Sequence, residues 1–257
     1  MANTKIQWAN KVWNPVTGCT PISSGCLNCY AKRMANRLRG RCGYPVDEPF
    51  KITLHSERLE EPFHWRKPCM IFVCSMGDLF HEDVPTMFID RILGVISDCP
   101  QHIFLVLTKR PQNIEPKLYG GSEKHPFRYL GGGDYLSNLW IGVSVENQET
   151  VDERIPILLQ IPVALRFVNV EPMLGPINLL QYLITDNTRK ISWVICGGET
   201  GPKARPMKRE WAEDLLDQCQ AAGIPFFYKQ GLGDDGEFCE MPVLRGQYWD
   251  SIPKERK

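Results

Sequence analysis

The stretch WNPVTGCTPISSGCLNCYAKRMANR, residues 13–37, contains the residues that best indicate the chemistry of this protein. Three cysteines, Cys19, Cys26 and Cys29, stand there in a C-x6-C-x2-C spacing, just ahead of a segment that reads as a helix. A structural zinc site normally has four protein ligands, and no second CxxC or HxxxH pair completes one here. Three thiolates around a [4Fe–4S] cluster would leave one iron open to a small molecule. We therefore expect a metal centre held by these three cysteines.

The composition excludes several other classes of protein. With 257 residues the chain can bury a full core, and 30 basic against 30 acidic residues leave no net charge. A global attraction to nucleic acid or to a membrane surface is therefore not expected. The first residues, MANTKIQWANKVW, contain no apolar run, and no window approaches the roughly 20 apolar residues of a membrane span. The sequence predicts a cytoplasmic protein with no membrane partner.

The other cysteines have a simpler interpretation. Without an export signal the compartment is expected to be reducing, where isolated thiols act as small buried hydrophobic groups rather than as disulfides. We predict this for Cys42, Cys69, Cys74, Cys99, Cys196, Cys219 and Cys239.

Short apolar runs alternate with amphipathic segments along the chain. Continuous apolar runs are typical of parallel strands that are buried on both faces. We expect strands near 11–17 and at 51–57, 69–76, 102–110, 139–147, 164–172, 192–200 and 224–230, with helices at 86–100 and 209–223. About eight such repeats predict an α/β fold, a parallel (β/α) barrel of the TIM type, full or partial. A doubly wound open sheet remains the alternative.

A single domain over residues 1–257 is the simplest organisation. It would contain the three-cysteine loop at 13–37, a Gly-rich loop at 119–135 that could cover a site, and an irregular C-terminal extension from about 231 to 257.

Polar residues follow nearly every predicted strand. Functional groups of parallel α/β proteins collect at the carboxyl ends of the strands, so this pattern predicts one polar rim. Its members are His55, Glu57, Ser75, Asp78, Thr108, Lys109, Arg110, Ser144, Glu146, Asn147, Asn169, Glu171, Gly197, Gly198, Glu199, Lys229 and Gln230.

The segment NPVTGCTPISSGCLNCYA resembles the cysteine loop of the radical S-adenosylmethionine superfamily, in the form found in its spore-photoproduct-lyase-like branch. The superfamily spacing is C-x3-C-x2-C, so this loop has three extra residues, and Asn28 stands where an aromatic residue is usual. FLVLTKRPQNI, IGVSVENQETVDERIPILL and RFVNVEPMLGPI are similar to later segments of that branch. The whole chain also resembles a phage-associated family of uncharacterised proteins.

The resemblance implies a [4Fe–4S] cluster on the three cysteines and S-adenosylmethionine at its open iron, cleaved reductively to a 5′-deoxyadenosyl radical. It also implies an electron donor such as flavodoxin or ferredoxin. Ser75, Asp78, Ser144, Glu146 and Tyr30 are then expected to bind the cofactor. The catalytic residues stay unknown, with Lys109, Glu171 and Glu199 as candidates.

A nucleotide or nucleic acid is the substrate that the resemblance suggests, and the basic stretches 31–41 and 203–210 could contact its phosphates. Two other classes of function remain open. A non-catalytic zinc or iron–sulfur protein that binds nucleic acid or a protein partner would need a fourth ligand, such as Cys42, His55 or His64. A metal-dependent barrel hydrolase would instead use the rim carboxylates and not the cysteines.

Overall fold

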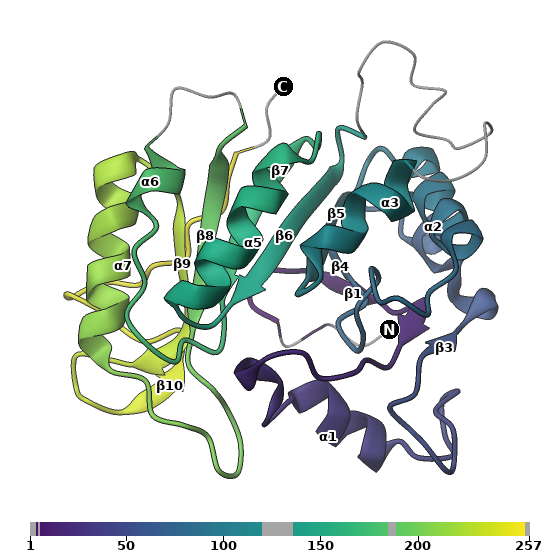
Figure 1. The fold of residues 1–257 in the computed structure, drawn as a ribbon, viewed down its shortest axis with the longest axis horizontal. Helices are drawn as coiled ribbons and strands as arrows, with labels where there is room; N and C mark the ends of the chain where they lie inside the picture. Colours follow the sequence, from purple (N-terminus) through teal and green to yellow (C-terminus); the bar gives the residue numbers. More distant parts are fainter. Residues whose placement is uncertain (1–3, 5, 120–135, 185–188, 255–257) are drawn as a thin grey trace. The chain divides into compact units, whose positions relative to one another are not determined.

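The computed structural model describes residues 4, 6–119, 136–184 and 189–254 (Figure 1). The contacts within the chain divide it into two compact units. The first unit comprises Met1–Ile22, Cys29–Ile141 and Ile161–Ala164. The second comprises Ser23–Asn28, Gly142–Gln160 and Leu165–Lys257. Strand β6 (Leu139–Val145) belongs to both, because the boundary between the units falls inside it.

The strands of the main sheet follow the order β1-β4-β5-β6-β7-β8-β9-β10. The pairs β1–β4, β4–β5, β7–β8 and β8–β9 are parallel, and β10 pairs with β9 antiparallel. Strands and helices alternate along the chain, and β1 and β10 stand at opposite ends of the strand order. The predicted α/β fold class, a parallel (β/α) barrel in its partial form, is confirmed.

In the first unit, three parallel strands form the centre and helices follow them. The apolar runs of β4 and β5 are almost entirely buried, as expected for strands covered on both faces. Helices α2 and α3 pack against each other (Figure 1). The elements are β1 (Lys11–Trp13), β2 (Val16–Thr17), α1 (Tyr30–Arg37), β3 (Thr53–Leu54), β4 (Met70–Val73), α2 (Thr86–Asp98), β5 (Ile103–Thr108) and α3 (Ile114–Tyr119).

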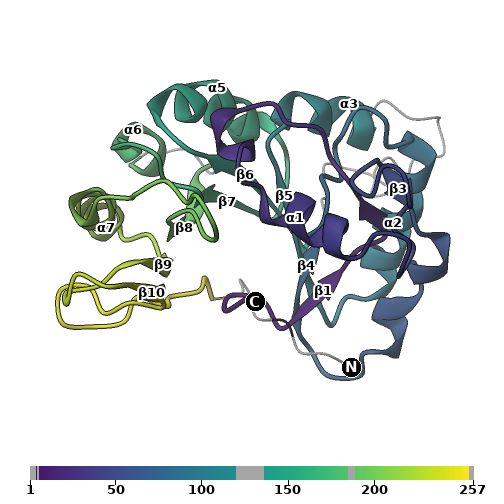
Figure 2. The same ribbon diagram turned by 90° about the horizontal axis from the view of Figure 1, so that it is seen from below.

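The second unit repeats this arrangement. Helix α7 packs against α6 and β9, and the β9–β10 hairpin closes the sequence of strands (Figures 1 and 2). Gly223 ends α7 with a left-handed φ of 63°, a conformation that favours glycine at the end of a helix. The elements are α5 (Gln148–Gln160), β7 (Leu165–Val170), α6 (Leu180–Leu183), β8 (Ile191–Gly197), α7 (Arg209–Ala222), β9 (Phe226–Leu232) and β10 (Phe238–Glu240).

Some sequence predictions need correction. The strand expected at 51–57 is only the two-residue β3, which pairs antiparallel with β2 in a separate sheet and adds nothing to the main one. Its exposed Lys51 and Leu54 explain why it is not a core strand. The C-terminal extension, predicted to be irregular, contains β10.

The remaining sequence predictions have mixed outcomes. Cys74, Cys99, Cys196 and Cys219 are buried as expected, whereas Cys42 and Cys239 are exposed. Residues 120–135 of the Gly-rich loop lie outside the described residues. None of the described helices combines the length and apolar character needed to cross a membrane.

Candidate functional site

The cysteine loop is shared between the two units. Cys19 and Cys29 belong to the first, and Cys29 immediately precedes α1. Cys26 belongs to the second, at the end of a short 3₁₀ turn (Ser24–Cys26), with its Sγ 3.6 Å from the hydroxyl of Ser23. None of the three cysteines forms a disulfide, and all are half-buried. Each part of the loop is bonded to strand ends of its own unit.

Two glycines allow the loop to pack closely. Gly18 has a φ of 92°, and a Cβ there would lie 2.2 Å from the carbonyl oxygen of Lys51. A Cβ on Gly25 would lie 2.4 Å from Oε1 of Glu146. A side chain at position 18 would meet backbone atoms, and one at position 25 would displace the buried carboxylate of Glu146, so the glycines before Cys19 and Cys26 allow the loop to pack closely.

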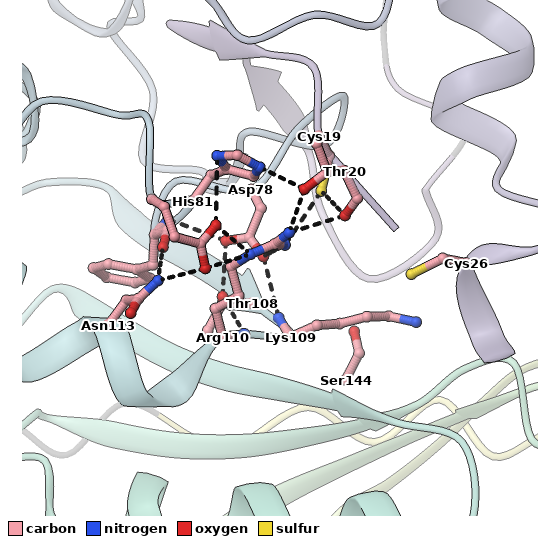
Figure 3. A network of polar contacts seen from close by, with 12 residues as sticks. Cys19, Thr20, Cys26, Asp78, His81, Thr108, Lys109, Arg110, Asn113 and Ser144 are labelled. Carbon is pink, nitrogen blue, oxygen red and sulfur yellow. Dashed lines mark hydrogen bonds and ion pairs between the residues drawn. The ribbon is translucent and has the colours of Figure 1, made fainter. Parts of the chain in front are cut away.

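Arg110 holds the first part of the loop to the end of β5 (Figure 3). Its side chain is 1% exposed, and Nη2 donates to both the carbonyl oxygen and Oγ1 of Thr20 at 2.9 Å. Nη1 lies 3.4 Å from the Sγ of Cys19 and 3.4 Å from Oδ2 of Asp78, while Nε donates to Glu82. Burial by itself would lower the pKa of Arg110, but Cys19, Asp78 and Glu82 outweigh it and raise that pKa. Arg110 therefore stays protonated beside the first cysteine.

His81 supports the same segment as a neutral imidazole. Its Nδ1 accepts from the backbone N–H of Asp83 at 3.1 Å, so the proton is on Nε2, which donates to Oγ1 of Thr20 at 2.8 Å. Burial, and then the nearby Arg110, lower the pKa of His81. The hydroxyl of Thr20 thus accepts from both His81 and Arg110, which fixes the residue that follows Cys19 (Figure 3).

The carboxylate of Asp78 joins the ends of β4 and β5. It accepts from Oγ1 of Thr108 at 2.7 Å and from the backbone N–H groups of Lys109 and Phe80 at 3.2 and 3.0 Å (Figure 3). With Arg110 as a further donor, both oxygens have partners within the protein. In the same unit the hydroxyl of Tyr30 donates to the backbone oxygen of Ser75. The hydrogen bonds therefore bring Tyr30 to Ser75 in the segment that follows β4, which also contains Asp78.

In the second unit, Glu146 anchors the other part of the loop to the end of β6. Its side chain is fully buried, and its oxygens accept from the hydroxyl of Ser23 at 2.6 Å and from Nη1 of Arg154 at 3.2 Å. Arg154 also donates to the backbone oxygen of Ser144 at 2.8 Å. Glu146 thus forms a buried ion pair with Arg154 and, through Ser23, holds the loop segment that contains Cys26.

Glu199, after β8, makes a second anchor for this loop segment. It accepts from Arg205 through Nη2 at 2.6 Å and Nε at 3.0 Å, and from the side-chain amide of Asn28 at 2.8 Å. Arg205 also donates to the backbone oxygen of Ser24 at 2.9 Å. Burial by itself would raise the pKa of Glu199, but hydrogen bonds from Arg205 and Asn28 prevail and lower it to about 2.

The lowered pKa of Glu199 predicts a loss of stability in acid. Because the folded value is about 2 and the ordinary value is 4.5, the ionised carboxylate stabilises the fold above about pH 4.5, and this contribution disappears as the pH falls toward 2. We expect a contribution of no more than about 3 kcal/mol. Melting temperatures of the wild type and Glu199→Gln, measured at about pH 5.5 and about pH 3, should differ most at the higher pH. An equal difference at both would contradict the assignment, and Glu210→Gln on the exposed start of α7 is the control.

Glu171, after β7, contacts the end of β9. Its Oε1 lies 2.6 Å from Nζ of Lys229 and 2.9 Å from Nε2 of Gln230, and its Oε2 accepts from the side-chain amide of Asn169 at 3.3 Å. These four rim residues form one cluster within the second unit, which we call the β7–β9 cluster.

Several residues that hold the cysteine loop or its anchors were missed as site candidates from the sequence, among them Thr20, His81 and Arg205. Arg205 lies in a basic stretch, which by itself reads as a solvated surface, and its pairing with Glu199 depends on the fold. Arg110 was recognised only as a member of the rim. Roles of Lys109, Glu171 and Glu199 in catalysis, and of the five expected cofactor ligands, stay predictions.

The donor set fits the predicted cluster chemically. The three cysteines form no disulfide and are partly accessible, and the sulfur of Cys19 has an N–H group of Arg110 beside it, as cluster sulfurs commonly do. Over the described residues, no group of three or more His, Cys, Asp or Glu side chains is placed to hold a single metal ion.

Solved structures with a similar fold include two of spore photoproduct lyase. One, complexed with dinucleoside spore photoproduct, has a TM-score of 0.55 and 11% identity over 86% of this chain and 75% of its own. The other, a cysteine-to-serine mutant, has a TM-score of 0.52 at the same identity and coverage. This likeness shows the fold alone. No curated protein sequence matches the chain.

A family model described as a protein of unknown function, DUF5131, matches residues 3–253. The match spans nearly all of the sequence, from the segment before β1 to the residues after β10. The chain therefore belongs to the DUF5131 family.

Proposed function

We propose that this protein is a radical S-adenosylmethionine-type iron–sulfur enzyme, with Cys19, Cys26 and Cys29 as the ligands of a [4Fe–4S] cluster. The observation that carries the proposal is the cysteine loop itself: three half-buried cysteines outside any disulfide, whose segments are bonded to buried charged residues at strand ends. The fold likeness to spore photoproduct lyase supports it. When bound, the cluster would supply the electron that cleaves S-adenosylmethionine to a 5′-deoxyadenosyl radical.

The residues around the loop have roles that the proposal can use. Arg110 and His81 hold Thr20, and so fix the backbone after Cys19. Ser23 and Asn28, on either side of Cys26, are held by Glu146 and Glu199. A metal centre with a vacant coordination position needs its ligands held in place, because flexible ligands would close over the open site.

S-adenosylmethionine is the cofactor that the proposal implies. We assign to its binding Tyr30, Ser75 and Asp78 in the first unit, and Ser144 and Glu146 in the second. The substrate class we propose is a nucleotide or nucleic acid, and the electron would come from a small donor protein such as flavodoxin or ferredoxin. Lys109, Glu171 and Glu199 are the candidates for contact with the reacting groups.

Iron content tests the proposal directly. Protein purified without oxygen is expected to be brown and to contain about four iron atoms per chain. Each of Cys19→Ala, Cys26→Ala and Cys29→Ala should remove most of the iron and the visible absorbance, because three thiolates are the minimum set. Cys42→Ala and Cys239→Ala are the matched controls, since both thiols are exposed and lie outside the loop.

The alternatives give different results in the same measurement. A colourless protein that holds zinc, or one whose iron survives loss of any loop cysteine, would overturn the proposal. Formation of 5′-deoxyadenosine after reduction in the presence of S-adenosylmethionine then distinguishes an enzyme from a protein that only binds the cluster.

A further inference from the structure

The β7–β9 cluster contains a buried hydrogen-bond acceptor without a partner. The side chain of Asn169 is 4% exposed, and within the described part of the chain its Oδ1 accepts no hydrogen bond. Buried polar side-chain atoms are bonded in the large majority of cases, because leaving one unpaired costs about 1–3 kcal/mol. An unpaired buried acceptor at the end of a strand, where functional groups collect, indicates a binding site.

The orientation of the Asn169 amide follows from its neighbour. Nδ2 donates to Oε2 of Glu171 at 3.3 Å. The reversed orientation would place two acceptor oxygens against each other, so the unpaired atom is the oxygen. A ligand at this position must therefore present an N–H or O–H group to Asn169.

Lys229 supplies the complementary donor. Its ammonium lies 2.6 Å from Oε1 of Glu171, and its side chain is 18% exposed. An ammonium has three donor hydrogens, and the structure assigns a single acceptor to it among the described residues. The two oxygens of Glu171 thus position two groups. One accepts from the Asn169 amide, whose Oδ1 is an unused acceptor, and the other accepts from Lys229 Nζ, which is a donor.

Strand β8 lies between β7 and β9, and Gly197 at its end has no side chain to crowd Glu171 and Gln230. A Cβ on Gly197 would lie 3.3 Å from Cγ of Gln230 and 3.4 Å from Cδ of Glu171. Gln230 also donates to the backbone oxygen of Gly198 at 2.7 Å, which fixes its amide. Phe238 of β10 lies against Gly198 and is 43% exposed, so an aromatic face is available beside these strand ends.

We infer that Asn169, Glu171 and Lys229 form a binding site for a cyclic amide or imide edge, in which a ring N–H lies next to a carbonyl oxygen. The N–H donates to Asn169 Oδ1, and the carbonyl oxygen accepts from Lys229 Nζ. This inference rests on the proposed function in that it names the group on the substrate that this end of the sheet recognises. Its physical argument uses none of the cysteines.

Calorimetric titration of the full chain with uridine and with 3-methyluridine tests the inference. Uridine carries an imide N–H between two carbonyl groups, and 3-methyluridine differs by one methyl group that removes this donor. We expect uridine to bind at least about tenfold more tightly, since the methylated ring leaves Asn169 Oδ1 unpaired. Equal affinities, or no binding of uridine, would overturn the inference.

Protein variants locate the site. Lys229→Met should weaken uridine binding by about tenfold, whereas Lys190→Met, at the opposite end of β8, should leave it unchanged. Asn169→Leu should make the two nucleosides bind equally. If the buried Asn169→Leu variant fails to fold, the comparison of nucleosides and Lys229→Met still decide the result. Unchanged uridine binding in Lys229→Met would reject this site.

Iron content, measured on the same samples, separates this inference from the proposed function. Protein that contains iron but does not bind uridine would overturn this inference alone. Uridine binding without iron overturns the cluster proposal and leaves the binding site in place.

Discussion

Arg110→Met is expected to lower the free energy of unfolding by about 3–5 kcal/mol, the range for breaking a buried ion pair from one side. The guanidinium is 1% exposed, and Asp78, its partner at 3.4 Å, has a side chain that is 7% exposed. The variant would leave the Asp78 charge buried without its cation and would release both oxygens of Thr20. Urea unfolding followed by circular dichroism measures the change.

Arg91→Met is the control for Arg110. Arg91 is an exposed cation of α2 in the same unit, 5.7 Å above the ring of Phe88, and its removal should cost less than about 1 kcal/mol. Adding Asp78→Asn to Arg110→Met should recover part of the loss, because the unpaired charge is then removed. A loss below about 1 kcal/mol for Arg110→Met would mean that this network does not stabilise the fold.

Glu146→Leu is expected to have an effect of similar size in the second unit, about 3–5 kcal/mol. Glu146 and Arg154 are 0% and 2% exposed, so the remaining guanidinium would be buried without its carboxylate. The hydroxyl of Ser23 would also lose its acceptor, which frees the loop segment that contains Cys26. Under the proposed function, the variant should therefore retain less iron than the wild type even at temperatures where it is folded.

Glu153→Gln is the matched control for Glu146. This carboxylate also faces Arg154, at 3.8 Å from Nε, but its side chain is 62% exposed, so its loss should cost less than about 0.5 kcal/mol. The double variant Glu146→Leu/Arg154→Leu should be more stable than Glu146→Leu alone. Equal losses for Glu146→Leu and Glu153→Gln would show that burial of the pair contributes nothing.

The fold was predictable because its signals are local. Strand β6, LWIGVSV, is buried at all seven positions, and its apolar run already indicates a strand covered on both faces. The spacing of Trp211, Leu215 and Cys219, followed by Gly223, gives both the buried face and the end of α7. The prediction for 51–57 was wrong because a short β-rich segment has the same sequence pattern whether it joins the main sheet or, as β3 does, pairs only with β2.

The polar residues that follow the strands of the main sheet were equally predictable, since such a residue lies at the edge where its strand ends. His55 and Glu57 are exceptions, because they follow β3, which is not part of the main sheet. The hydrogen-bond and ion-pair partners of these side chains could not be predicted. Asp78 and Glu146 read as open carboxylates in the sequence, whereas the first accepts from Thr108, Lys109 and Phe80 and the second from Ser23 and Arg154. Each of these sites combines residues from separate parts of the sequence, and no spacing rule connects them.

By itself, the sequence determined the alternation of strands and helices, the polar strand ends and the three thiols on one loop, because each depends on neighbouring residues. Only the tertiary structure decided which charges are paired and buried, that Arg110 and Glu146 hold the loop, and that Oδ1 of Asn169 accepts no hydrogen bond from the described residues. Pairing and burial arise from residues far apart in the chain meeting at a strand end, and their energies depend on the exclusion of water that this meeting brings.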